Sequence, residues 1–154
     1  MLISTKGRYA LRFMLDLAEH QGEGYLSLKT VATRQNISLK YLEAIANSLQ
    51  TSGLVISARG KAGGYRLVDE PRRIYVGSIL YASQGGLNTV DCDKGTGCNC
   101  TQSCLTKALW ADLNALINGF FNNLSLQHLL DSEQREIKEL TLIRKENKDE
   151  SICG

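Results

Sequence analysis

The sequence predicts a mainly α-helical fold with one small β-hairpin, extended by a long helix that suits dimerisation. Apolar residues recur at helical spacing in three segments between residues 5 and 50. Two short runs of β-forming residues follow, separated by a glycine-rich segment. A further apolar stripe at helical spacing lies beyond residue 104. At 154 residues and 43% hydrophobic content, the chain has the size of one small folded domain with an additional helical arm.

Serine residues mark the beginnings of the first helices. Ser4 and Thr5 can cap a first helix, and Ser27 can cap a second helix that stops at residues 35–37. Ser38 can then cap a third helix over residues 39–50. Two short helices joined by a tight turn, the second capped by serine, are typical of a helix-turn-helix.

A hairpin is predicted directly after the third helix. Residues 54–57 and 65–68 are rich in β-forming side chains, and residues 58–64 join them. The glycines of this connection permit positive φ and close backbone approach, while Arg59 and Lys61 place positive charge on the exposed tip. A basic, glycine-rich hairpin after a helix-turn-helix indicates a wing.

The uneven charge of the chain agrees with a polyanionic partner. The formal net charge is only +2, but the basic residues concentrate in the first half. We therefore expect binding to double-stranded DNA, with the start of the third helix in the major groove and the wing tip against the minor groove or backbone. The expected DNA-binding residues are Thr5, Lys6, Tyr9, Ser38, Lys40, Tyr41, Glu43, Arg59, Gly60, Lys61, Gly63, Gly64 and Tyr65.

Composition and periodicity divide the chain into four expected regions. A short helix over residues 76–83 closes the first of them. The regions are a DNA-binding winged helix-turn-helix domain at 1–83, a cysteine loop at 84–104, a dimerisation helix with a short helix at 105–132, and a charged C-terminal helix and tail at 133–154.

The third region carries an apolar stripe on a helix of about 18 residues that begins near Leu105. Leu109, Leu113, Leu116 and Phe120 belong to this stripe. After so small a DNA-binding module, such a helix is better explained as a dimerisation arm than as core. We therefore expect a homodimer.

Four of the five cysteines cluster within the second region. They are Cys92, Cys98, Cys100 and Cys104, while Cys153 lies far from them in sequence. In a reducing cytoplasm such a cluster more often binds metal or performs redox chemistry than forms disulfides. The spacing lacks the C-x2-C pairs of zinc sites and favours an iron-sulfur cluster, but zinc and a bare thiol switch remain alternatives.

Other classes of protein find little support. No stretch approaches the roughly 20 apolar residues that cross a bilayer, and the first residues contain no apolar signal core, so we expect a cytoplasmic protein without membrane contact. His20 and His128 lie far apart, with no nucleophile motif around them. The sequence therefore predicts no catalytic residues and no enzyme.

Three motifs occur together, in order, with the cysteine loop. They are the run ISTKGRYALR at residues 3–12, SLKYLE at 38–43 and RGKAGGY at 59–65. This combination resembles the Rrf-type family of bacterial winged helix-turn-helix transcription regulators, which includes iron-sulfur cluster regulators, cysteine-metabolism regulators and nitric-oxide sensors. The resemblance covers residues 2 to about 130. It implies a homodimer made through the long helix, with each winged domain on one half of a pseudo-palindromic operator.

The resemblance also implies the ligands of a metal centre. The cluster-binding members of the family use three cysteines at the spacing of Cys92, Cys98 and Cys104, which implies an iron-sulfur cluster, 2Fe-2S or 4Fe-4S, on these three residues.

The fourth ligand departs from the family patterns. Iron-sulfur regulators supply a His three residues after the last cysteine, where this chain has Lys107, and an ammonium cannot ligate. Nitric-oxide sensors use a carboxylate from the first helix, where this chain has Arg8. Cys100 becomes the first candidate, with Asp91, Asp93, an external ligand or no fourth protein ligand as alternatives.

Together these observations lead us to expect a dimeric transcription regulator, most often a repressor in this family, that senses iron-sulfur cluster or redox status. It would control genes of iron-sulfur assembly or sulfur metabolism. One alternative is a cluster-free regulator of cysteine metabolism that acts with a partner protein. Another is a redox or electron-transfer protein, which the basic wing disfavours because electron transfer needs no DNA-shaped hairpin.

Overall fold

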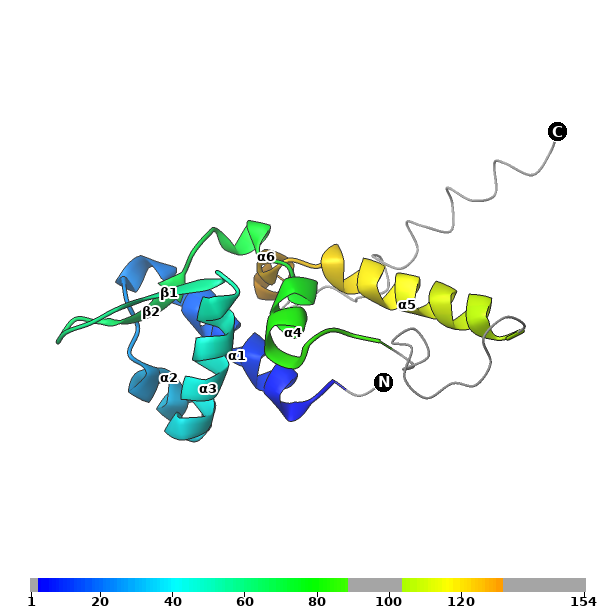
Figure 1. Ribbon diagram of the computed structural model, residues 1–154. Helices are drawn as coiled ribbons and strands as arrows, with labels where there is room; N and C mark the ends of the chain where they lie inside the picture. Colours follow the sequence, from blue (N-terminus) through cyan, green and yellow to red (C-terminus); the bar gives the residue numbers. More distant parts are fainter. Residues whose placement is uncertain (1–2, 89–103, 132–154) are drawn as a thin grey trace.

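The computed structural model describes residues 3–88 and 104–131. Helices α1 to α4 and the hairpin form one compact group, from which α5 extends on the side away from the hairpin (Figure 1). The elements in chain order are α1 (Thr5–Glu19), the 3-10 turn η1 (Gln21–Glu23), α2 (Leu28–Gln35), α3 (Leu39–Thr51), β1 (Val55–Ala58), β2 (Gly64–Leu67), the 3-10 turn η2 (Pro71–Arg73), α4 (Val76–Gln84), α5 (Lys107–Asn122) and α6 (Leu126–Leu130). The predicted mainly α-helical fold with a small hairpin is confirmed.

Serine caps begin the first three α-helices as predicted. The side chains of Ser4, Ser27 and Ser38 each accept a hydrogen bond from the backbone N–H three residues later, at 3.0, 3.1 and 3.3 Å. Each bond satisfies one of the free N–H groups that the first turn of a helix leaves unpaired. Thr5 is already inside α1, so Ser4 alone supplies the cap.

The main hydrophobic core lies where the inner faces of α1, α2 and α3 meet the hairpin. Phe13 and Met14 of α1 are fully buried, as are Leu42 and Ile45 of α3. These side chains recur every three or four residues, so each helix buries one stripe and leaves the opposite face in solvent. The buried apolar members of this cluster are Ala10, Phe13, Met14, Leu17, Ala18, Leu26, Val31, Ala32, Ile37, Leu42, Ile45, Ala46, Leu49, Val55, Leu67, Ile74, Ile79 and Leu126.

The hairpin forms where predicted, but its strands differ by one residue. β1 and β2 pair in antiparallel register, and each lies one residue closer to the tip than the predicted 54–57 and 65–68. Leu54 falls outside β1 because its N–H donates to the carbonyl of Leu49 at 3.0 Å. That bond closes the end of α3, so the strand begins only at the next residue.

The long helix is shorter than predicted and only partly free. It begins at Lys107 and spans 16 residues, whereas Leu105 lies in the preceding turn and is 98% exposed. Ile117 and Phe120 pack on a second buried cluster formed by Val76, Leu80, Leu87 and Leu124. The predicted stripe is therefore not a single free surface, because its C-terminal part joins α5 to α4.

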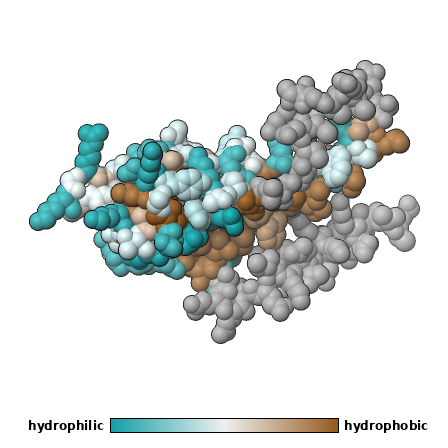
Figure 2. All heavy atoms as spheres, turned by 90° about the horizontal axis from the view of Figure 1, so that it is seen from below, coloured by the Kyte–Doolittle hydropathy of each residue, from teal (hydrophilic) through white to brown (hydrophobic). Residues whose placement is uncertain are grey.

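The two ends of the molecule differ in surface character. Figure 2 shows hydrophilic residues at the hairpin end, whereas hydrophobic residues gather along the visible face toward α5. Within residues 3–88 and 104–131, no helix has the length and apolar content that a bilayer span requires. The charged helix and tail predicted at 133–154 lie outside the described residues.

A buried carboxylate joins α1 to α2. Asp16 is 1% exposed, and Arg34 donates to both of its carboxylate oxygens, to Oδ2 through Nε at 3.2 Å and to Oδ1 through Nη2. Gln35 adds a third bond, from Nε2 to Oδ2 at 2.8 Å. The ring of His20 bridges the same groups, with Nδ1 2.8 Å from the carbonyl oxygen of Asp16 and Nε2 3.1 Å from Arg34 Nη1. A buried charge that is paired and fully hydrogen-bonded in this way holds the two helices in one relative position.

We predict that Asp16→Ala lowers the free energy of unfolding by about 2 to 3 kcal/mol, because it leaves the Arg34 guanidinium and the Gln35 amide without their acceptor. Arg34 is one third exposed, so water offsets part of this loss. Urea unfolding followed by circular dichroism measures the change. Glu19→Ala, on the exposed face of the same helix, should change stability by less than about 0.5 kcal/mol. Equal effects of both variants would contradict this view of Asp16.

Candidate nucleic-acid interface

The third helix is held so that its N-terminal turn faces outward. Asn36 ends α2 in the left-handed region at φ 52°, and Ile37 is buried directly after it. This turn places Ser38 as the cap of α3. Because Leu42 and Ile45 fill the core, the opposite face of α3 is left in solvent. That face carries three of the residues expected to bind DNA, Lys40, Tyr41 and Glu43, and all three are exposed.

The hairpin tip presents positive charge to solvent. Arg59, Gly60 and Lys61 are all exposed, and Gly60 adopts φ 103°, which a side chain would disfavour. The tip is closed by a backbone bond from Gly63 N–H to the Gly60 carbonyl at 3.0 Å. A flexible pair of cations on a defined turn suits contact with phosphate or with a narrow minor groove.

Two residues expected at the interface also have internal contacts. A Cβ atom on Gly64 would collide with the backbone of Leu26, which forms a bridge with Tyr65 through backbone bonds of 2.8 and 2.9 Å. The Tyr65 ring packs edge-to-face on Phe13, with ring centroids 6.2 Å apart. Gly64 and Tyr65 thus tie the base of the wing to the core, whereas the tip extends freely.

The beginning of α1 lies against the third helix. Lys6 Nζ donates to Ser48 Oγ at 3.0 Å, and the rings of Tyr9 and Tyr41 meet edge-to-face with centroids 5.8 Å apart. Thr5 is exposed, and its hydroxyl accepts from Arg8 at 3.2 Å. The structure therefore brings Tyr9 beside Tyr41, although 32 positions separate them in the sequence. Lys6 instead meets α3 at Ser48, which is not among the expected residues.

Sequence reasoning missed a further cation on the wing. Arg66 is exposed on β2, and its guanidinium lies 5.0 Å from the centroid of the Tyr25 ring. The alternation of β2, with Leu67 buried beside exposed Arg66, was a signal that could have found it. Arg66 extends the positive charge of Arg59 and Lys61 toward the base of the hairpin.

Only one of the predicted metal ligands is described. Cys104 lies shortly before α5, its Sγ is 3.3 Å from Thr106 Oγ1, and this hydrogen bond lowers the pKa of the thiol from its ordinary value. The thiolate that a lower pKa favours is the form that binds metal. Cys92, Cys98, Cys100 and Cys153 lie outside the described residues. Among the residues that can be described, no three His, Cys, Asp or Glu side chains gather into a metal site.

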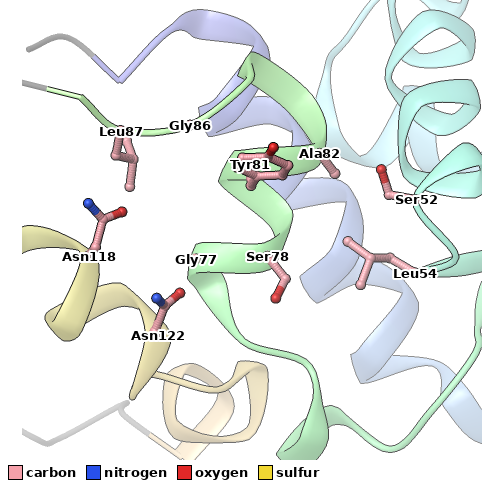
Figure 3. Close-up of a pocket in the computed structure, with 10 residues that line it drawn as sticks. All are labelled: Ser52, Leu54, Gly77, Ser78, Tyr81, Ala82, Gly86, Leu87, Asn118 and Asn122. Atoms are coloured by element: carbon pink, nitrogen blue, oxygen red, sulfur yellow. The ribbon is translucent and has the colours of Figure 1, made fainter. Parts of the chain in front are cut away.

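A hollow of about 520 Å³ lies where α4 meets α5 (Figure 3). Tyr81, which is 71% exposed, borders it from α4, and Asn118 and Asn122 border it from α5. The hollow therefore belongs to the junction between the compact domain and its arm. Its lining residues are Ser52, Leu54, Gly77, Ser78, Tyr81, Ala82, Gly86, Leu87, Asn118 and Asn122.

A serine-capped third helix with a free outer face, followed by a basic hairpin, defines a winged helix-turn-helix DNA-binding protein. Residues 3–132 match the model of the Rrf2 family, which is described as an iron-dependent transcriptional regulator. The chain belongs to the Rrf2 family of transcription regulators.

Relatives and solved structures support this membership. The chain is 41% identical over 133 residues to the HTH-type transcriptional regulator IscR of Serratia proteamaculans, a match that covers 86% of this chain and 81% of the relative. It is also 41% identical over 138 residues to IscR of Photobacterium profundum, covering 89% and 80%. Among solved structures, CymR, the global cysteine regulator of B. subtilis, has a TM-score of 0.73 at 34% identity, covering 85% of this chain and 97% of CymR. T. potens IscR has a TM-score of 0.71 at 35% identity, covering 88% and 93%.

We predict that Arg59→Ala weakens binding to a DNA duplex that the protein itself selects from a random-sequence pool, by about 1 to 3 kcal/mol. Fluorescence anisotropy at several salt concentrations measures the affinity. The wild-type affinity should fall steeply with added salt, because phosphate contacts release counterions.

The matched control is Arg72→Ala, which removes the same charge from η2. Arg72 pairs with Glu70 at 2.7 Å, and η2 lies against α6 rather than at the wing tip. Unchanged affinity in Arg59→Ala, or equal losses in both variants, would show that the wing tip does not contact DNA.

Proposed function

We propose that this DNA-binding transcription regulator works as a homodimer and senses iron-sulfur cluster status through Cys92, Cys98 and Cys104. The observation that carries the proposal is the place of Cys104, a thiol of lowered pKa two residues before the cap of α5. The family description as iron-dependent and the relatives named IscR support the same view. In this role it represses genes of iron-sulfur assembly or sulfur metabolism.

The chemistry of the donor set fits such a cluster. Thiolates are the usual ligands of iron in iron-sulfur clusters, and the hydrogen bond with the Thr106 hydroxyl lowers the pKa of the Cys104 thiol, which favours the thiolate. Lys107 is exposed one turn away, and its ammonium cannot serve as a ligand. Cys100 is the first candidate for the fourth position. When bound, the cluster supplies a centre whose presence depends on iron, sulfide and oxidants.

The DNA-binding surface in this proposal is the outer face of α3 together with the wing. Ser38, Lys40, Tyr41 and Glu43 meet phosphates and base edges in the major groove, and Arg59 contacts the minor groove or backbone. Thr5, Lys6 and Tyr9 hold the DNA backbone from the start of α1. The remaining wing contacts are Gly60, Lys61, Gly63, Gly64 and Tyr65.

The homodimer in this proposal forms through the N-terminal part of α5. Leu109 and Leu116 are 58% and 66% exposed, and Leu113 is only half-buried. No residue of α5 is fully buried. A helix with this much exposed leucine surface buries it well against a second copy. In this arrangement residues 1–83 bind DNA, residues 84–104 form the cluster loop, residues 105–132 form the dimer arm and residues 133–154 form a charged tail.

The order of these regions along the chain gives a way for the state of the cysteines to change DNA binding. Residues 84–104 connect the winged domain to α5, so the state of the cysteines bears on the position of each winged domain relative to the dimer axis. Two winged domains must match half-sites one or more helical turns apart. A small change in their relative position therefore alters affinity or operator choice.

A second candidate function is a cluster-free regulator of cysteine metabolism that acts with a partner protein. The structural likeness to the global cysteine regulator CymR favours it. Lys107, which occupies the position of the fourth ligand in iron-sulfur regulators, also favours the cluster-free candidate. The metal content of the purified protein separates the two candidates.

We predict that the double variant Leu113→Asp and Leu116→Asp is monomeric, because it places charges in an apolar interface at a cost of several kcal/mol. Sedimentation velocity measures the oligomeric state, and circular dichroism checks that the fold is kept. Asp112→Asn, a change at an exposed position of the same helix, is the control and should remain dimeric. A dimeric double variant would place the interface elsewhere.

We further predict that Cys92→Ala, Cys98→Ala and Cys104→Ala each abolish stable cluster binding and change DNA affinity in the same direction. Anaerobic absorption spectra with iron and sulfide counts measure the cluster. Cys153→Ala is the matched control and should change neither property.

Cys100→Ala identifies the fourth ligand. Loss of the cluster would assign the position to Cys100, and a normal cluster would assign it elsewhere. A full iron and sulfide content in all three of the first variants would show that these cysteines do not hold the cluster. Purified wild-type protein without iron and sulfide would instead support the cluster-free candidate.

A further inference from the structure

Arg12 of α1 joins three parts of the helix-turn-helix, although the DNA-binding residues considered above do not include it. Its Nε donates to Gln35 Oε1 at 3.1 Å, and its Nη2 donates to the backbone carbonyl of Gln35. Its guanidinium also lies 5.5 Å from the centroid of the Tyr9 ring. Planar guanidinium groups make such paired bonds and stack on aromatic faces, which an ammonium does less well.

The two bonds to Gln35 fix the end of α2. Gln35 is the last residue of α2, and carbonyls in the last turn of a helix have no partner within the helix. Arg12 supplies a donor and a positive charge at this negative end of the helix dipole. The next residue, Asn36, takes the left-handed conformation that turns the chain into α3. Arg12 therefore holds the residue from which the turn to the third helix starts.

The stacking contact continues to the third helix itself. Tyr9 lies one turn before Arg12 on α1, and its ring meets that of Tyr41 in the first turn of α3 at an angle of 82°. Arg12 thus contacts the end of α2 directly and the start of α3 through Tyr9. Gln35 in turn donates to buried Asp16, which anchors the cluster to the core.

We propose that Arg12 is a positioning residue for DNA binding, which sets the direction of the turn at 36–38 and of the first turn of α3 without contacting DNA itself. The guanidinium is already engaged by Gln35 and Tyr9 within the protein, which favours this arrangement over a phosphate contact. The inference rests on the proposed use of the α3 face and the wing as the DNA-binding surface.

The test compares full-length Arg12→Ala, Arg12→Lys, Gln35→Ala and the double variant Arg12→Ala with Gln35→Ala, on the duplex selected by the wild-type protein. We expect Arg12→Ala and Arg12→Lys to weaken binding by about tenfold, because lysine keeps the charge but not the paired bonds. Gln35→Ala keeps the carbonyl acceptor and should weaken binding by about threefold. The double variant should weaken binding by less than the two single effects combined, because both single changes remove the bond between Arg12 and the Gln35 side chain.

The salt dependence separates positioning from direct contact. Each phosphate contact contributes about 0.9 to the slope of log affinity against log salt, so a positioning role leaves the slope of Arg12→Ala unchanged. A slope smaller by about one, or wild-type affinity in Arg12→Lys, would overturn the proposal. A fully additive double variant would overturn it too. Thermal unfolding of each variant checks that the compared proteins are folded. If Arg12→Ala does not fold, Arg12→Lys and Gln35→Ala provide the test.

Arg59→Ala, measured in parallel, distinguishes a failure of the positioning role of Arg12 from a failure of the proposed DNA-binding surface. Weak binding by Arg59→Ala with normal binding by Arg12→Ala would overturn only the positioning role. Normal binding by both variants would overturn the DNA-binding surface as well.

Discussion

The structure depends on the packing of α1, which contacts α2, α3 and the hairpin as well as α4 and α6. Phe13 and Met14 are fully buried among α2, α3 and the hairpin, and the same helix lies against α4 and α6. Gly7 allows close approach at the other end, where an added Cβ would collide with the side chain of Gln84. A helix that must bury most of its surface leaves few positions for polar groups. Two of the polar side chains that α1 does carry bind specific groups of the neighbouring helix α2.

Two polar residues of α1 fix its position relative to α2. Asp16 is buried and paired with Arg34, and Arg12 on the exposed side binds the last carbonyl of α2. Ion pairs and hydrogen bonds are directional, whereas apolar contacts permit sliding at little cost. The hydrophobic core thus brings the helices together, and the polar contacts specify the direction in which α3 is presented. A DNA-binding helix needs this second property, since base contacts fail when the helix is displaced by about an ångström.

Helix α5 carries both packed and exposed apolar side chains. Phe120 and Ile117 join the cluster around Leu80, while Leu109 and Leu116 remain largely in solvent. One face of α5 is therefore attached to the compact domain, while another face leaves leucine side chains in solvent. In the proposed homodimer, α5 would therefore link the interface between subunits to the winged domain through α4.

Local signals in the sequence determined the starts of the first three α-helices, the wing and the fold class. Ser4, Ser27 and Ser38 cap through bonds to neighbours three residues away, so their effect is visible in the sequence alone. The motifs likewise determined the family, because they combine the cap, the turn and the wing in one order. The tertiary structure decided what depends on residues distant in the chain. The pairing of Asp16 with Arg34, the contact of Arg12 with Gln35 and the attachment of Phe120 to α4 each join segments 18 or more positions apart. Periodicity shows that a side chain faces inward or outward, but only the folded arrangement shows which group it meets there.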